Sequence, residues 1–235
     1  MIFKFNRYFN QKFFSLLFLI VSKIWFRKKD FEVYGKDHGK YFLPKLKKCK
    51  YDKWIISAGV GDNISFDIEM LNLGYKIIFI DPTPLAIEYF KNNFDHEFYK
   101  KKSLFYKKGL WKTKTNLKFF YSDKNVISNT ISNYNQSNKS INIETITIDD
   151  IMFENKIESV FLIKLDIEGA ELAIVDYIFQ KKIKPHYLLI EFDFLKQQNL
   201  FRVIISLLGL LKKLKKLNFK IIYIDNLNFT FKREI

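Results

Sequence analysis

The chain of 235 residues has few of the residues that mark disulfide-rich or metal-binding proteins. It contains one cysteine, Cys49, so it can form neither an intrachain disulfide nor a cysteine-based metal site. Its three histidines, His38, His96 and His186, are far apart and lack the spacing of metal ligands. Because a lone cysteine suits a reducing compartment, we expect a cytoplasmic protein.

Long apolar segments are also scarce. The apolar stretch 13–26 is interrupted by Lys23 and falls short of the roughly 20 residues that a membrane-spanning helix requires. Basic residues precede it, as in a signal peptide, but no small-residue cleavage site follows. We therefore expect an amphipathic helix that packs on the domain or associates peripherally with the inner face of a membrane. A signal anchor is the alternative.

Acidic residues are outnumbered, since 40 Lys and Arg against 25 Asp and Glu give a net charge of +15. Such a chain attracts nucleic acid or anionic lipid. The basic residues are dispersed in short clusters, however, and no nucleic-acid-binding motif accompanies them. We expect no nucleic-acid partner, and either a solvated basic surface or a role at a membrane surface.

After residue 50, short apolar runs alternate with helical patterns. Strands are predicted at 54–59, 76–81, 103–111, 159–166 and 186–194, and helices at 63–73, 83–94, 170–180 and 200–217. The last residues predict a hairpin. This order is typical of an α/β fold with helices on both faces of a mostly parallel sheet, and the hairpin adds one antiparallel strand.

The stretch from about 112 to 150 breaks this alternation and predicts a strand-rich insertion. Its Ser- and Asn-rich part, 122–140, is either a cap over a ligand pocket or a disordered surface loop. Residues 1–50 are expected to form a helical extension and a lead-in rich in Gly and aromatic residues. Residues 51–235 are expected to form one domain.

The loop SAGVGDN, residues 57–63, follows the first predicted strand. Gly59 and Gly61 permit a tight turn, and the next helix offers free N–H groups. Asp81 ends the second strand, 22 residues after Gly59, where a carboxylate can accept hydrogen bonds from ribose hydroxyls. Ile64 replaces the third Gly of the dinucleotide fingerprint, so the pattern favours S-adenosylmethionine over NAD. An ordinary tight turn is the structural alternative.

Several segments, in this order and spacing, resemble the FkbM-type methyltransferases: SAGVGDNISFD (57–67), IDPTP (80–84), GLW (109–111) and IKLDIEGAE (163–171). The lead-in YGKDHGKYFLP (34–44) is similar to a segment of one branch of that family. The resemblance covers about residues 34–195. It implies a class I Rossmann-like fold, S-adenosylmethionine as cofactor, and O-methylation of a sugar hydroxyl or related small molecule, as in bacterial polysaccharide biosynthesis.

The resemblance also implies that the glycine loop and the acid after the second strand contact the cofactor. The predicted cofactor-binding residues are Ser57, Gly59, Gly61, Asp62, Asn63, Asp81 and Pro82.

A second group of candidates follows the fourth and fifth predicted strands, whose ends share one edge of the sheet. Methyl transfer requires an aligned nucleophile and benefits from a base. We expect Asp166 and Glu168 to contact cofactor or acceptor, Glu191 or Asp193 to be the base, and Lys164 to pair with one of these acids. Asp193 stands where relatives often carry His. No metal is expected, because no His accompanies these acids.

Structural roles and two other functions compete with these assignments. Acids at a helix N-terminus, such as Glu168 and Glu171, are stabilised there without any catalytic role. A nucleotide-dependent sugar oxidoreductase would use the same loop and Asp81, but Ile64 disfavours it. The other alternative is a non-catalytic, membrane-associated Rossmann-like protein of a glycan assembly system. In that protein the helix at 200–217 would contact lipid, rather than simply turn its lysines to water.

Overall fold

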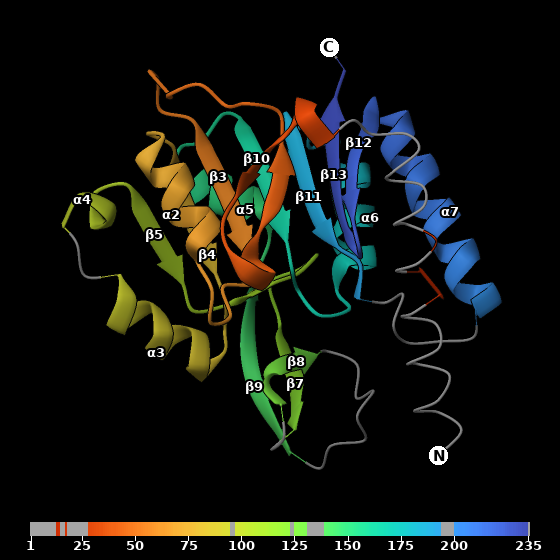
Figure 1. Cartoon of the computed structure of the whole chain (residues 1–235). Helices are drawn as coiled ribbons and strands as arrows, with labels where there is room; N and C mark the ends of the chain where they lie inside the picture. Colours follow the sequence, from red (N-terminus) through yellow and green to blue (C-terminus); the bar gives the residue numbers. More distant parts are fainter. Residues whose placement is uncertain are drawn as a thin grey trace.

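The computed structural model describes residues 13–14, 17, 28–94, 97–122, 125–130, 139–193 and 200–234. A seven-stranded sheet in the order β12-β13-β11-β10-β3-β4-β5 forms its centre (Figure 1). Its strands are β3 (Trp54–Ala58), β4 (Lys76–Ile80), β5 (Ser103–Tyr106), β10 (Val160–Leu165), β11 (Tyr187–Glu191), β12 (Phe219–Asp225) and β13 (Asn228–Arg233). Strand β13 is antiparallel to both neighbours and the other pairs are parallel. The predicted fold class is confirmed.

Helices cover both faces of this sheet. They are α2 (Ser65–Asn72), α3 (Pro84–Asn93), α4 (Glu97–Lys100), α5 (Ile148–Glu154), α6 (Glu171–Lys181) and α7 (Leu200–Lys216), with short 3-10 turns η1 (Lys28–Asp30) and η2 (Asp37–Gly39). Apolar residues of α5, α6 and α7 pack on one face. Residues of α2, α3 and the lead-in pack on the other. Thr83 caps α3 and Pro84 occupies its first turn, which fixes where this helix begins.

The chain changes direction across the sheet at β3. Strands β4 and β5 extend the sheet on one side of β3, and β10 and β11 extend it on the other. At such a switch point the loops after two neighbouring strands separate and leave a crevice at their carboxyl ends. The loops that follow β3 and β10 therefore border the position where a ligand is expected.

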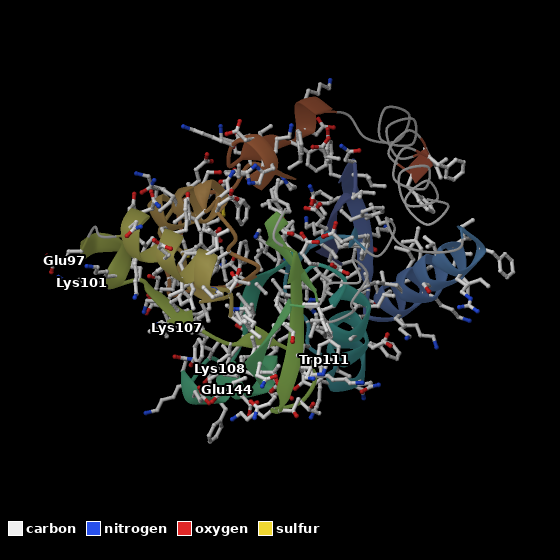
Figure 2. The ribbon with its side chains drawn as sticks, turned by 90° about the horizontal axis from the view of Figure 1, so that it is seen from below. Glu97, Lys101, Lys107, Lys108, Trp111 and Glu144 are labelled. Atoms are coloured by element: carbon white, nitrogen blue, oxygen red, sulfur yellow. The ribbon has the colours of Figure 1, made fainter. Side chains whose placement is uncertain are left out.

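A second, smaller sheet lies below these carboxyl ends in Figure 1. It has the order β6-β9-β7-β8, with β6 (Gly109–Leu110), β7 (Asn116–Ser122), β8 (Asn125–Thr130) and β9 (Lys139–Ile146). In Figure 2, Lys108 and Glu144 lie next to each other on this underside, where a 3.0 Å ion pair joins the segment before β6 to β9.

The prediction of one strand at 103–111 is wrong. Strand β5 ends at Tyr106, and Gly109 begins a separate strand that pairs in parallel with β9. A Cβ at Gly109 would lie 2.8 Å from Ile143 Cδ1, so the absence of a side chain allows this close approach. Helix α5, which begins at Ile148 directly after β9, was not predicted.

The lead-in forms a hairpin of β1 (Glu32–Tyr34) and β2 (Tyr41–Leu43). The helix expected at 13–26 lies outside the described residues apart from Phe13, Phe14 and Leu17, and Phe14 is buried in the core that α7 helps to form. Within the described ranges, no helix is both long and apolar enough to cross a membrane.

Candidate functional site

A cavity of about 220 Å³ opens at the carboxyl ends of the parallel strands. Among its lining residues are most of the predicted cofactor-binding residues: Gly59, Gly61, Asp62, Asn63, Asp81 and Pro82. Four of the predicted catalytic residues also line it: Lys164, Asp166, Glu168 and Glu191. Ser57 and Asp193 are buried and do not line the cavity.

The two glycines of the first loop have different surroundings. Both have positive φ angles, 85° at Gly59 and 53° at Gly61, which disfavour residues with a side chain. A Cβ on Gly59 would lie 1.7 Å from the Asp166 carbonyl oxygen, so this glycine lets the ends of β3 and β10 approach each other. A Cβ on Gly61 would meet no atom within 4 Å. Gly61 therefore borders open space.

Asp81 is buried and organises this loop. One carboxylate oxygen accepts hydrogen bonds from the backbone N–H groups of Val60 (2.9 Å) and Gly61 (3.1 Å). The other oxygen accepts from the backbone N–H of Thr83 (2.9 Å) and from its hydroxyl (2.6 Å). A carboxylate has about four acceptor positions, so these four donors nearly exhaust its capacity.

The lead-in hairpin clamps the same loop from outside. The Lys36 backbone N–H donates to the Ser65 hydroxyl (2.7 Å), and the Asn63 side-chain amide donates to the Lys36 carbonyl (3.1 Å). His38 Nε2 lies 3.1 Å from Asp62 Oδ1. Because His38 and Gly39 also line the cavity, the lead-in forms part of its wall. Sequence reasoning identified this segment but gave it no place in the site.

Lys164 is buried where β10 ends, and its ammonium group contacts other groups of the protein. It donates to the Gly59 carbonyl (2.7 Å) and lies 3.8 Å from Asp166 Oδ2. The Tyr41 ring lies 5.8 Å from the same ammonium. Lys164 therefore links the glycine loop to the acid that follows β10, which agrees with the predicted pairing to an acid.

Behind this lysine are buried acids that sequence reasoning missed. Burial raises the pKa of Asp67, although the charge of Lys164 opposes the rise. The Ser57 hydroxyl lies near this carboxyl, but neither group makes a well-formed hydrogen bond to any described residue. The sequence contained one indication that Asp67 is buried: it lies within the apolar pattern of α2, next to Phe66.

Burial also raises the pKa of Tyr41 well above its usual range, and the charges of Asp166 and Glu191 add to the rise. The Tyr41 hydroxyl has no hydrogen-bond partner among the described residues. Tyr41 comes from β2, so the lead-in places an uncharged hydroxyl among the acids at the ends of β10 and β11.

Glu171 lies in the first turn of α6, as expected, but it is fully buried rather than on the surface. Its Oε1 accepts a hydrogen bond from the Gly169 N–H (2.7 Å), whereas Oε2 has no partner within the described part of the chain. Burial, followed by the charge of Asp193, raises its pKa well above the usual range. Asp193 thus belongs to a buried pair of acids behind the cavity.

The outer wall comes from the small sheet, which contributes Leu110, Phe119, Ile143 and Thr145. The predicted lid at 122–140 falls largely outside the residues whose side chains the structure describes. In the described part of the chain, no group of three or more His, Cys, Asp or Glu is arranged to hold a metal ion.

Comparison with solved structures finds similar chains at low identity. A fibrillarin pre-rRNA processing protein from Methanococcus jannaschii is 12% identical, with a TM-score of 0.43, and the match covers 88% of this chain and 84% of that one. A SAM-dependent methyltransferase from Methanosarcina mazei is 12% identical, with a TM-score of 0.41, over 80% of this chain and 95% of that one. A TehB-like SAM-dependent methyltransferase from Corynebacterium glutamicum is also 12% identical, with a TM-score of 0.37, over 79% and 83%.

A search of curated proteins finds no match. The model of the methyltransferase FkbM domain, by contrast, matches residues 23–221, which include the lead-in, the glycine loop and the acids after β10 and β11. The match therefore contains every element that builds the cavity. The chain belongs to the FkbM methyltransferase family, and its cofactor is S-adenosylmethionine.

Proposed function

We propose that the protein O-methylates a hydroxyl of a sugar or glycan precursor in bacterial polysaccharide biosynthesis. One observation carries this proposal: a glycine loop and the carboxylates of Asp166, Glu168 and Glu191 line the same cavity. Carboxylates accept hydrogen bonds from hydroxyl groups, and one of them can act as a base. The small-molecule acceptor is therefore expected between the acids and the small sheet.

The glycine-loop side fits S-adenosylmethionine, because Gly61 borders space that a side chain would fill. When bound, the cofactor supplies a methyl group that its sulfonium makes susceptible to attack. The residues that would hold it are Gly59, Gly61, Asp62, Asn63, Asp81 and Pro82. Asp81 acts mainly through the loop, since the four donors that it binds fix the loop's shape.

The acid side supplies the base. We assign this role to Glu191 rather than Asp193, because Glu191 lines the cavity and Asp193 is buried behind it. Glu191 takes the proton of the acceptor hydroxyl, while Asp166 and Glu168 hold neighbouring hydroxyls by accepting hydrogen bonds. The distance between acceptor and methyl group is then fixed by groups on two adjacent strand ends.

Lys164 has a positioning role in this scheme. Its ammonium is held by the Gly59 carbonyl and lies 3.8 Å from Asp166, so it fixes the loop relative to the acid. Ser57 is buried at the end of β3, just before the glycine loop, so we assign it a structural rather than a cofactor-contacting role. We place the enzyme in the cytoplasm, which suits the lone Cys49, and at the inner face of the membrane.

A sugar oxidoreductase is the second candidate, since Tyr177 and Lys181 have the Tyr-x-x-x-Lys spacing of some dehydrogenases. Both side chains are engaged by Asp149: the Tyr177 hydroxyl donates to it (2.8 Å) and the Lys181 ammonium lies 3.3 Å from it. Neither residue lines the cavity. This position disfavours the oxidoreductase.

Calorimetric titration with S-adenosylmethionine and with NAD separates the candidates. We expect only S-adenosylmethionine to bind. Binding of NAD alone would favour the oxidoreductase, and binding of neither would favour the non-catalytic alternative. A panel of free and nucleotide-linked sugars is then incubated with the enzyme and cofactor, and S-adenosylhomocysteine formation and the mass of the sugar are followed. Cofactor binding without a methylated sugar oxygen would refute the acceptor class.

Two substitutions test the assignment of the acids. Glu191→Gln should reduce turnover by about 10²–10⁴-fold, the usual contribution of a general base, with cofactor affinity unchanged. Asp166→Asn should also reduce turnover. Glu158→Gln, at an exposed acid outside the cavity, is the matched control and should behave as wild type. Full activity of the Glu191 variant would remove its role as the base.

A further inference from the structure

The outer face of α7 is apolar over its first two turns. Phe201, Ile204, Ile205 and Leu208 are exposed there to 70%, 38%, 54% and 61%, and their spacing places them along one side of the helix. The opposite side carries Val203, Leu210 and Leu214, which are buried in the core. Because the helix already has a buried face, this second apolar stripe contributes nothing to the described core. Figure 1 shows α7 on the outside of the molecule, beside β12.

Lysines continue the same outer face toward the end of the helix. Lys212 lies four residues after Leu208 and seven after Ile205, and Lys215 lies seven after Leu208, so both follow the apolar stripe around the helix. Lys216 is also exposed. Lys213 points elsewhere, because it pairs with Asp176 of α6. Within the described residues, no ion pair engages Lys212, Lys215 or Lys216.

Acidic partners are missing from the sequence around this face. Helix α7 contains no Asp or Glu. Residues 1–29 contain seven Lys or Arg and no acid, and Phe14 of that segment is buried in the same core as α7. Neither the N-terminal segment nor a second copy of α7 could neutralise the lysines. A partner that neutralises these lysines would therefore have to bring its own negative groups.

We propose that the outer face of α7 docks the protein on an anionic lipid surface. Phe201, Ile205 and Leu208 enter the interfacial region of the bilayer, and Lys212, Lys215 and Lys216 face lipid phosphates. Docking through α7 does not depend on the acceptor of the methyl group. A helix that lies in the membrane plane binds peripherally, through buried apolar area and attraction to anionic headgroups together.

The test uses the full-length protein and sedimentation with vesicles of phosphatidylcholine, alone or with phosphatidylglycerol. We expect binding only when phosphatidylglycerol is present, and weaker binding as salt rises. The triple variant Phe201→Ser, Ile205→Ser and Leu208→Ser should lower the partition coefficient at least about tenfold, because it removes three inserted side chains. Phe153→Ser is the matched control, since Phe153 is 86% exposed on α5.

The charge requirement is tested separately. Replacing Lys212, Lys215 and Lys216 by Gln should weaken binding to the anionic vesicles. Replacing Lys47, Lys48 and Lys50, exposed lysines outside α7, removes the same net charge and should change binding much less. An equal loss in both sets would show that only total charge matters and would overturn the proposal.

Two further outcomes would also overturn it. Light scattering could show a dimer that the serine variant converts to a monomer, which would make a second copy the occupant of the stripe. Thermal unfolding could show that the serine variant is strongly destabilised while its vesicle binding is unchanged. That result would mean that the protein's own chain covers the apolar stripe of α7. Retained methyl transfer in the variants would separate this result from a failure of the proposed function.

Discussion

The two sides of the cavity differ in how their polar groups are satisfied. On the glycine-loop side, the Asp81 carboxylate binds four donors, and Asn63 and Ser65 are bonded to the lead-in. Behind the acid side, the Tyr41 hydroxyl and both oxygens of Asp67 have no hydrogen-bond partner among the described residues. Each buried polar group without a partner costs about 1–3 kcal/mol, so the second region is destabilising by itself.

This difference indicates two kinds of contribution to function. A satisfied loop keeps one shape before the cofactor arrives, and binding then costs little conformational entropy. A buried acid and a buried hydroxyl without partners are unfavourable for folding, and such groups occur where activity needs acids with perturbed pKa values. Substitutions in the loop should therefore affect stability and cofactor binding, whereas substitutions behind the acids should change the pH dependence and leave the fold intact.

The largest effect is expected at the first glycine of the loop. Gly59→Ala places a Cβ 1.7 Å from the Asp166 carbonyl oxygen, a backbone atom that cannot move away without shifting β10. We expect the free energy of unfolding to fall by more than about 4 kcal/mol, or the variant not to fold. Gly61→Ala meets open space, so it should cost only about 1–2 kcal/mol for its positive φ, yet weaken S-adenosylmethionine binding.

Urea unfolding followed by tryptophan fluorescence measures both variants, and calorimetry measures cofactor affinity for the one that folds. A similar loss of stability in both would mean that the contact with β10 does not distinguish the two glycines.

The next effect is expected at Asp81. Asp81→Asn replaces one acceptor oxygen by an NH2 group, which cannot accept from either pair of donors. We expect a loss of about 2–3 kcal/mol in the free energy of unfolding, because buried N–H groups lose their partner. Asp62→Asn is the control in the same loop, where the exposed contact with His38 contributes less than about 1 kcal/mol. Equal stability of the two variants would contradict the role of Asp81 in shaping the loop.

A smaller, pH-dependent effect is expected at Glu171. Its folded pKa is raised well above 4.5, so the folded state keeps a proton that the unfolded state has released. The free energy of unfolding should therefore decrease as pH rises above about 4.5 and continue to decrease until the folded pKa is passed. Each unit of difference corresponds to about 1.4 kcal/mol.

Glu171→Gln keeps an oxygen for the Gly169 N–H and cannot ionise, so its stability should vary less with pH than that of the wild type. Chemical unfolding at several pH values provides the comparison, with the exposed Glu158→Gln as control. Parallel pH profiles for Glu171→Gln and wild type would show that the stability of the protein does not depend on the protonation of Glu171.

The contrast between the two sides also explains which features the sequence could predict. Periodic apolar runs predicted the main strands and helices, because burial on the two faces of the sheet follows local spacing. The capping box at Thr147 and Asp150 was a local signal for α5 that the strand-like pattern before it obscured. The strand break after Tyr106 depends on a contact between Gly109 and Ile143, which local spacing does not reveal.

The candidate site divides in the same way. Gly61, Asp81 and Asp166 follow strands, so the rule that strand ends share an edge predicted their place beside the cavity. The clamp between Lys36 and Ser65 spans 29 residues of sequence and joins two segments without a shared periodicity. The burial of Glu171 could not be predicted either, because a position at a helix N-terminus does not indicate which neighbours pack over the side chain.

The smallest effect is expected from the hydroxyl of Tyr41, and a second tyrosine of the lead-in provides its control. The Tyr34 hydroxyl donates to Glu32 (2.9 Å) and accepts from the Leu46 N–H (2.8 Å), so Tyr34→Phe should cost about 1–2 kcal/mol of unfolding free energy. Tyr41→Phe removes a buried hydroxyl without a described partner and keeps the ring beside Phe66, so the free energy of unfolding should not fall and should rise by about 1 kcal/mol, the lower end of the cost of such a group. Urea unfolding of both variants decides the matter. If Tyr41→Phe costs as much as Tyr34→Phe, the hydroxyl has a partner, and the acid side is better satisfied than the comparison of the two regions requires.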